Sequence, residues 1–262
     1  MGHTVNTTDL FRLDNRRALI TGSSRGIGYR LAVGLAASGA DVVINGTTAE
    51  GVDKAVVALN DAVGRDAAIG RAFDITDGDA VENAVAAIED ENGAIDILVN
   101  NAGIQRRVPL LDCDTATWQE VLRTNLDSVF HVGRAVARHM VARERGKIIN
   151  ICSMQSELGR PSIAPYAASK GGVKMLTKNM CAEWAKHNIQ VNGLGPGYFV
   201  TELTAALVDD REFSAWVENR TPAGRWGEVD ELIGGAVFLA SDASSFVNGH
   251  ILYVDGGMSA VV

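Results

Sequence analysis

Short apolar runs alternate along this chain with longer stretches in which apolar positions recur every three to four residues. A strand is predicted where an almost continuous apolar run is bounded by glycine or polar residues, because strands of a parallel sheet are buried on both faces. Such runs occupy residues 17–21, 41–45, 67–73, 95–100, 147–152, 189–193 and 251–254. The chain therefore predicts about seven strands.

The stretches between these runs have helical periodicity. The first helix carries Ile27, Leu31 and Leu35 on one face and is expected to stop at Gly39. Further helices are predicted at residues 49–63, around 81–88, at 115–142, from Tyr166 onward and at 228–240. Between residues 198 and 226 the pattern loosens, which predicts a substrate flap.

Strand–helix alternation without repeats or linkers predicts one α/β domain over residues 1–262. The expected fold is a Rossmann-type, doubly wound parallel sheet with helices on both faces. Ligands of such sheets bind beyond the carboxyl ends of the strands.

Composition narrows the possible partners. Hydrophobic residues make up 47% and charged residues 21% of the 262 residues, as in soluble globular proteins. A net charge of -8 counts against nucleic acid as a partner. There is no apolar run of membrane-spanning length and no signal-peptide pattern, so a cytoplasmic protein is expected. The three cysteines and five histidines lack metal-binding spacing, so no metal is expected.

Three residues can carry acid–base chemistry together: Ser153, Tyr166 and Lys170. Tyr166 and Lys170 lie on one face of a predicted helix, and Ser153 follows a predicted strand. An ammonium near a phenol is expected to lower the phenol pKa from its usual value of about 10. The trio therefore predicts a general acid for a carbonyl or a general base for an alcohol. Hydride transfer would need a nicotinamide cofactor.

A Tyr-x-x-x-Lys pair by itself is weak evidence, because a surface pair can arise by chance. The glycine-rich turn at residues 21–28 strengthens it. This turn follows the first strand and precedes an amphipathic helix, where glycines allow a pyrophosphate to approach the backbone. Its predicted cofactor contacts are Gly22, Ser24, Arg25, Gly26, Ile27 and Gly28.

Together with Asn-Asn-Ala-Gly at residues 100–103, these motifs resemble the short-chain dehydrogenase/reductase family, over residues 17–257. The resemblance implies that Asn125 completes a catalytic tetrad by holding a water that relays protons to Lys170, and that Lys170 also binds the nicotinamide ribose. It also implies a homotetramer. The remaining cofactor contacts that it implies are Asp74, Ile75, Asn101, Ala102, Gly103, Tyr166, Pro196, Gly197, Phe199 and Thr201.

The cofactor is expected to be NADP, with NAD as the alternative. Enzymes that prefer NAD usually carry an acidic residue at the end of the second strand. Here that strand ends in Asn45, Gly46 and Thr47, which would not repel a 2′-phosphate, and Arg25 supplies a positive charge.

The substrate is predicted to be a sugar acid. Gln105 and Arg106 follow the fourth strand and Gln155 follows Ser153, so these residues are expected beside Ser153 and Tyr166. Arginine binds carboxylates and glutamine suits hydroxyl groups, although a surface or subunit salt bridge would equally explain each arginine. The motifs at residues 104–107, 153–160 and 195–198 resemble the gluconate 5-dehydrogenase branch, which implies interconversion of gluconate and 5-ketogluconate. A 3-oxoacyl thioester reductase, a non-catalytic NADP-binding regulator and a purely structural subunit remain as alternatives.

Overall fold

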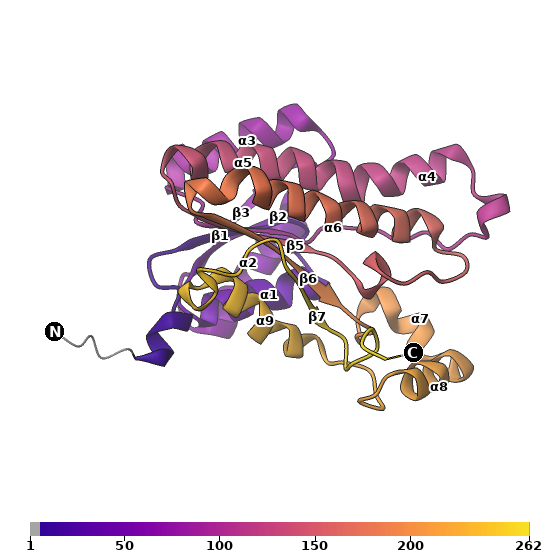
Figure 1. The fold of residues 1–262 in the computed structure, drawn as a ribbon. Helices are drawn as coiled ribbons and strands as arrows, with labels where there is room; N and C mark the ends of the chain where they lie inside the picture. Colours follow the sequence, from indigo (N-terminus) through magenta and orange to yellow (C-terminus); the bar gives the residue numbers. More distant parts are fainter. Residues whose placement is uncertain (1–5, 262) are drawn as a thin grey trace.

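A seven-stranded parallel sheet forms the centre of the computed structural model, which describes residues 6–261 (Figure 1). The strand order is β3-β2-β1-β4-β5-β6-β7. The strands are β1 (Arg17–Ile20), β2 (Asp41–Gly46), β3 (Ala68–Ala72), β4 (Ile97–Asn100), β5 (Gly146–Ile151), β6 (Ile189–Pro196) and β7 (Ile251–Val254). The predicted doubly wound α/β fold is confirmed; residues 1–5 and 262 of the predicted domain lie outside the described residues.

Helices cover both faces of the sheet, as Figure 1 shows. One layer holds α1 (Gly26–Ala37), α2 (Ala49–Val63) and α9 (Ile233–Ala240), and α1 packs against both others. The opposite layer holds α3 (Gly78–Asn92), α4 (Thr115–Leu122), α5 (Ser128–Ala142) and α6 (Ala164–Trp184). Each layer closes its own apolar core against the sheet. All six residues of β5 are buried, including the polar Lys147 and Asn150, because helices cover both faces of this central strand.

The strand order reverses between β1 and β4, and this reversal creates the site. From β1 the chain crosses to β2 and β3 on one side, and it then returns through α3 to β4 on the other side of β1. The loops that leave β1 and β4 therefore diverge at the carboxyl edge of the sheet. A crevice forms at such a switch point.

The helix predicted at residues 115–142 is interrupted in the structure. A π-helical turn, Arg123–Asp127, separates α4 from α5, and it contains Asn125. Such turns insert an extra residue and occur often at functional sites. Strand β6 runs to Pro196, beyond its predicted end, because Gly195 lets the ring of Tyr253 on β7 pack against the strand.

The segment at residues 198–226 is folded, although its sequence pattern is loose. It contains α7 (Ala205–Val208) and α8 (Arg211–Arg220). Its aromatic rings gather around Tyr198, whose ring centre lies 5.5–5.9 Å from those of Phe213, Trp216 and Trp226. The segment is irregular because its helices are short, and its action as a flap stays a prediction.

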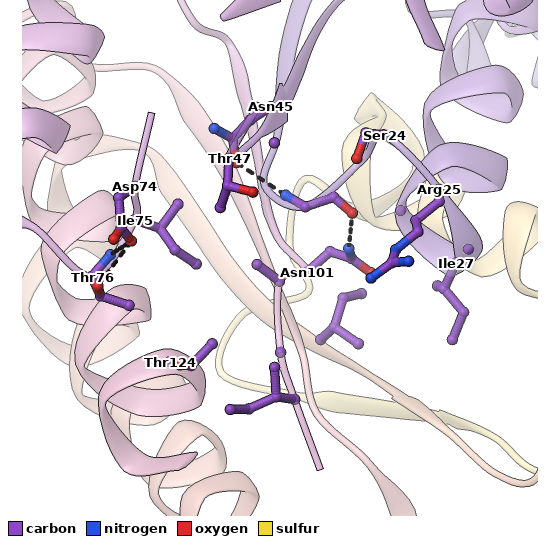
Figure 2. Close-up of a pocket in the computed structure, with 18 of the residues that line it drawn as sticks. Ser24, Arg25, Ile27, Asn45, Thr47, Asp74, Ile75, Thr76, Asn101 and Thr124 are labelled. Atoms are coloured by element: carbon purple, nitrogen blue, oxygen red, sulfur yellow. Dashed lines mark hydrogen bonds between the residues drawn. The ribbon is translucent and has the colours of Figure 1, made fainter. Parts of the chain in front are cut away.

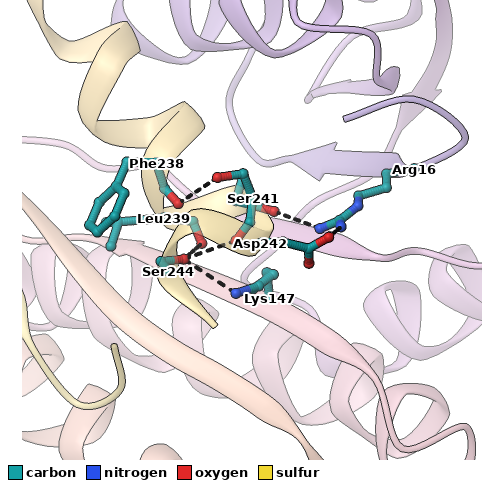
Figure 3. Close-up of polar contacts among 8 residues, drawn as sticks. Arg16, Lys147, Phe238, Leu239, Ser241, Asp242 and Ser244 are labelled. Atoms are coloured by element: carbon teal, nitrogen blue, oxygen red, sulfur yellow. Dashed lines mark hydrogen bonds and ion pairs between the residues drawn. The ribbon is translucent and has the colours of Figure 1, made fainter. Parts of the chain in front are cut away.

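A polar cluster of buried Arg16, Lys147 and Ser244 with the exposed Asp242 ties β1 and β5 to the end of α9 (Figure 3). Arg16 donates to the Asp242 carboxylate at 2.6 Å and to the Ala240 carbonyl at 3.2 Å. Lys147 Nζ donates to Ser244 Oγ at 3.2 Å, and only 5% of Lys147 is exposed. Burial lowers the Lys147 pKa to about 8, while the Asp242 carboxylate acts in the opposite direction.

No helix within residues 6–261 is both long and apolar enough to cross a membrane.

Replacing Lys147 by Met should change how stability depends on pH. The lysine binds its proton up to about pH 8 in the folded protein, but up to its ordinary value of 10.5 when unfolded. Between these values the unfolded state holds more protons, so the stability of the wild type relative to Lys147→Met should rise with pH, by up to about 3 kcal/mol. Urea unfolding over this pH range measures the difference. Lys186→Met, at an exposed position, is the control for loss of one positive charge; a difference that is constant with pH would contradict the prediction.

Candidate active site

A cavity of about 780 Å³ opens at the carboxyl edge of the sheet, where the strand order reverses. Figure 2 shows its lining, which comes from the turn after β1, the ends of β2 and β3, and the loop after β4. It contains most of the predicted cofactor contacts, namely Gly22, Ser24, Arg25, Gly26, Ile27, Gly28, Asn45, Gly46, Thr47, Asp74, Ile75, Asn101, Ala102, Gly103, Tyr166, Lys170 and Thr201. The other three, Pro196, Gly197 and Phe199, line an adjoining cavity of about 120 Å³.

The glycines at residues 22–28 bring the turn after β1 against the loop after β4. Gly22 has φ +60°, and a Cβ there would lie 2.9 Å from Ala102. A Cβ on Gly28 would lie 2.4 Å from Asn101 Nδ2. That nitrogen donates to the carbonyls of Thr21, at 2.9 Å, and Gly22, at 3.1 Å. Asn101 therefore holds the turn in place.

Asn45 joins the ends of three strands. Its side-chain oxygen accepts from Gly22 N at 3.1 Å (Figure 2). Its amide nitrogen donates to the carbonyls of Arg71 and Phe73, at 3.3 and 3.2 Å. A carboxylate has no N–H to donate to those carbonyls. The asparagine therefore supports the shape of the cavity from a buried position.

The cavity fits a dinucleotide. Gly26 has φ +61°, and a Cβ there would meet nothing within 4 Å, so the backbone at the start of α1 faces open space. Backbone N–H groups and the helix dipole at such a position favour a phosphate. Asp74 lies at the far end of the cavity, where its carboxylate accepts from the backbone and hydroxyl of Thr76, both at 2.8 Å (Figure 2). Within the described residues, no group of three metal-binding side chains gathers.

Ser153, Tyr166 and Lys170 meet where the two cavities join. Tyr166 lines both cavities, Lys170 lines the larger and Ser153 the smaller. Ser153 caps a short 3-10 turn, in which its Oγ accepts from Gln155 N at 3.1 Å. Ser156 in the same turn donates to the Lys170 carbonyl at 2.9 Å. This bond fixes the turn after β5 against α6.

The predicted effect of Lys170 on Tyr166 is wrong for this arrangement. Burial raises the pKa of Tyr166, and the Ser153 hydroxyl only partly offsets that rise. The Lys170 ammonium lies 5.8 Å from the centre of the Tyr166 ring and donates to the Ile151 carbonyl at 2.6 Å. Burial also lowers the Lys170 pKa to about 8. At neutral pH the phenol is therefore protonated and the amine is mostly charged.

Asn125 lies in the π-helical turn and is fully buried. Its side-chain oxygen accepts from Ile104 N at 2.8 Å, and its amide donates to Ile104 O at 2.9 Å and to Ser169 Oγ at 3.1 Å. The side chain thus ties the loop after β4 to α6. Its predicted role in holding a water stays a prediction.

The smaller cavity contains four of the five predicted substrate residues: Gln105, Ser153, Gln155 and Tyr166. Arg106 does not line it; its guanidinium forms a bidentate ion pair with Glu120, at 3.0 and 2.6 Å. Arg107 and Arg160 line the cavity instead. The sequence motifs at residues 104–107 and 153–160 already pointed to both loops, but a loop has no periodicity that shows whether Arg106 or Arg107 faces inward.

Comparisons with a family model, with characterised proteins and with solved structures each find relatives of this chain. Residues 22–259 match the family described as enoyl-(acyl carrier protein) reductase. The chain is 59% identical to gluconate 5-dehydrogenase of Gluconobacter oxydans, over 96% of this chain and 97% of that protein. It is 56% identical to 5-keto-D-gluconate 5-reductase of Escherichia coli, over 97% and 99%. A crystal structure of a gluconate 5-dehydrogenase from Burkholderia cenocepacia, in complex with NADP and tartrate, superposes with a TM-score of 0.95 at 59% identity, covering 98% of this chain and 100% of that one.

Replacing Gly28 by Ala should destabilise the protein. The new methyl group would displace Asn101 and remove its donor from the carbonyls of Thr21 and Gly22. Overpacking of this kind costs about 1–3 kcal/mol, which denaturant unfolding measures. Gly234→Ala, on α9, is the matched control because a Cβ there meets nothing within 4 Å. Equal stability of the two variants would show that the close approach at Gly28 is unimportant.

Proposed function

The chain belongs to the short-chain dehydrogenase/reductase family, and on that basis we propose that it is an NADP-dependent oxidoreductase that acts on a sugar acid. It interconverts a secondary alcohol and a ketone, with gluconate and 5-ketogluconate as the substrate pair. One observation carries this conclusion: Ser153, Tyr166 and Lys170 stand where a dinucleotide-sized cavity opens into a small cavity with two arginines. The similarity to two enzymes of gluconate and 5-ketogluconate supports the substrate pair.

The acid–base chemistry follows from the protonation state of Tyr166. Burial raises its pKa, so at neutral pH the phenol holds the proton that a carbonyl oxygen needs on reduction. Ser153, at the same junction, orients that oxygen. In oxidation, Tyr166 must first lose its proton and then accept one from the alcohol. The bound nicotinamide supplies or accepts the hydride. Lys170 Nζ lies 5.8 Å from the centre of the Tyr166 ring and donates to the Ile151 carbonyl, and it does not offset the rise in the phenol pKa.

The residues around the adenosine end suit NADP. Arg25 lines the cavity and is exposed (Figure 2). The end of β2 presents Asn45, Gly46 and Thr47, and no carboxylate stands there to repel a 2′-phosphate. The complex of a 59% identical relative with NADP supports the same choice.

A thioester reductase is the second candidate, because the matching family is described as enoyl-(acyl carrier protein) reductase. That description applies to the scaffold, which many chemistries share. The small cavity is lined by Arg107, Arg160, Gln105 and Gln155, which suit an anionic polyol better than an apolar acyl chain. We therefore favour the sugar acid.

Three further inferences concern the substrate flap, the oligomeric state and the cellular compartment. Residues 198–226, which line part of the smaller cavity, would act as a flap over the substrate. Exposed apolar side chains on α5 and α6, Phe130 and Met175, fit a homotetramer, which light scattering would test. The free cysteines fit a reducing cytoplasm.

Replacing Tyr166 by Phe should lower turnover by a factor of about 10²–10⁴ while NADP binding is kept, because the phenol is the general acid and base. In the wild type, kcat/KM for oxidation should rise between about pH 7 and pH 10, because the raised phenol pKa leaves little phenolate at neutral pH. Reduction should stay nearly constant over the same range and fall only above the raised pKa of the phenol, because the phenol keeps its proton until then. Absorbance of the reduced nicotinamide measures both directions. Turnover of Tyr166→Phe at the wild-type rate would refute the assignment.

Replacing Arg25 by Gln should raise KM for NADP about 10-fold or more, because a charge-assisted hydrogen bond to the 2′-phosphate is lost. KM for NAD should change little. Arg30→Gln is the matched control: Arg30 lies on α1, which begins directly after Arg25, but it pairs with Asp230 at 2.6 Å. Equal weakening of NADP and NAD would contradict the role given to Arg25.

A further inference from the structure

The larger cavity carries as many carboxylates as cations, although its expected ligand is a polyanion. Among the described residues, its charged lining consists of three cations and three carboxylates: Arg25, Arg123, Lys170, Asp74, Glu120 and Glu202. NADP would bring several negative phosphate charges into this space, so each carboxylate whose charge is not balanced opposes its binding. The affinity of the cavity therefore depends on which of these carboxylates are neutralised from outside it.

Glu120 is neutralised by Arg106, which lines neither cavity. The guanidinium forks the carboxylate: Nε donates to Oε2 at 3.0 Å and Nη2 to Oε1 at 2.6 Å. An ion pair at this exposure contributes little to stability. A bidentate pair nevertheless holds the carboxylate in one orientation and offsets its charge at short range. Arg106 therefore changes the electrostatics of the cavity without entering it.

Arg123 is the cation that this ion pair leaves available. It lies three residues after Glu120, across the junction of α4 and the π-helical turn, and residues at this spacing are neighbours on a helix surface. A Glu120 carboxylate without Arg106 would therefore attract the Arg123 guanidinium. Within residues 6–261, Arg123 forms no ion pair, and it lines the cavity as an exposed side chain. Its charge is thus available to a ligand.

An alternative role for the pair is to hold the loop after β4 in place. Asn125 already bonds this loop to the π-helical turn, because its side chain accepts from Ile104 N at 2.8 Å and donates to Ile104 O at 2.9 Å. Asn125 is fully buried, whereas Arg106 and Glu120 are exposed. The buried link is the stronger of the two, because exposed ion pairs contribute little. The main contribution of the pair is therefore its effect on charge.

We infer that Arg106 acts on cofactor binding: it neutralises Glu120 and thereby leaves Arg123 as an unopposed positive charge that faces the NADP cavity. Arg106 is a positioning residue, since it acts through these two side chains. The inference rests on the proposed NADP-dependent function and adds a determinant of cofactor preference besides Arg25. NADP carries one phosphate more than NAD, so it gains more from the same positive charge.

Fluorescence titrations with NADPH and NADH test this inference. Arg106→Met leaves the Glu120 charge unbalanced, so it should weaken NADPH about 3- to 10-fold at low salt and NADH about 2-fold or less. Adding Glu120→Gln should restore the NADPH affinity to near the wild-type value, although the link between loop and helix is still missing. Arg30→Met, which breaks a bidentate pair with Asp230 outside both cavities, is the matched control and should change neither affinity.

Two further variants and a change of salt separate charge from geometry. Arg106→Lys keeps the charge without the fork and should retain most of the NADPH affinity. Arg123→Met should weaken NADPH about as much as Arg106→Met does, because both remove the same available charge. At about 1 M salt, where the Debye length is about 3 Å, both losses should nearly vanish.

The outcomes separate this inference from the proposed function. If the variant with both Arg106→Met and Glu120→Gln binds NADPH as weakly as Arg106→Met alone, or if the loss does not depend on salt, the pair is only a mechanical link. The inference is then overturned while the NADP-dependent function stands, and unchanged NADPH binding in Arg106→Met overturns it as well. A wild type that binds no NADPH refutes the proposed function and the inference with it. Thermal unfolding shows whether each variant is folded; if Arg106→Met is not, Arg123→Met should still weaken NADPH and Glu120→Gln alone should not, and the reverse result overturns the inference.

Discussion

The site depends on the close approach of two backbone turns, one after β1 and one after β4. Parallel strands deliver both turns to the same edge of the sheet, but side chains would normally keep them apart. Gly22 and Gly28 remove that obstacle, and Asn101 bonds across the gap. Asn45 links the turn after β1 to the end of β3, because its side chain accepts from Gly22 N and donates to the Phe73 carbonyl. Once these turns are fixed, the open backbone at Gly26 and the predicted catalytic residues Tyr166 and Lys170 on α6 lie around one cavity.

The sequence predicted the frame of this site well. Helix α2 and strand β7 begin and end at the predicted residues, because strong apolar runs are bounded there by turn residues. Seventeen of the predicted cofactor contacts, from the glycine turn, the strand ends and the family resemblance, line one cavity, and topology brings together those that lie at strand ends. Their contact with the cofactor stays a prediction. The break in the helix at residues 115–142 was not predicted, because it accompanies a contact between Asn125 and Ile104 that only the folded chain makes.

Electrostatics were harder to predict, because burial is a property of the folded chain. Spacing places Tyr166 near Lys170, but it does not show that the amine reaches the Ile151 carbonyl while burial raises the phenol pKa. Lys147 is a second example. It lies at the start of a predicted strand, where a lysine is usually exposed to solvent. In the structure it is buried beside Arg16 and the end of α9. Lys147 lies near the amino end of β5, and Lys170 bonds to Ile151 at its carboxyl end. Burial lowers the pKa of both lysines.

The two adjoining cavities are lined by different parts of the fold. The larger is lined by backbone turns, glycines and strand ends, and its shape follows from the sheet topology. The smaller is lined by side chains from loops, including Arg107, Arg160 and Tyr198, whose directions the sheet does not determine. Tyr166 lines both cavities, so the predicted proton donor stands where the two meet. Members of a family that share this scaffold can therefore differ in substrate, because a few loop side chains shape the smaller cavity while the sheet topology fixes the larger one.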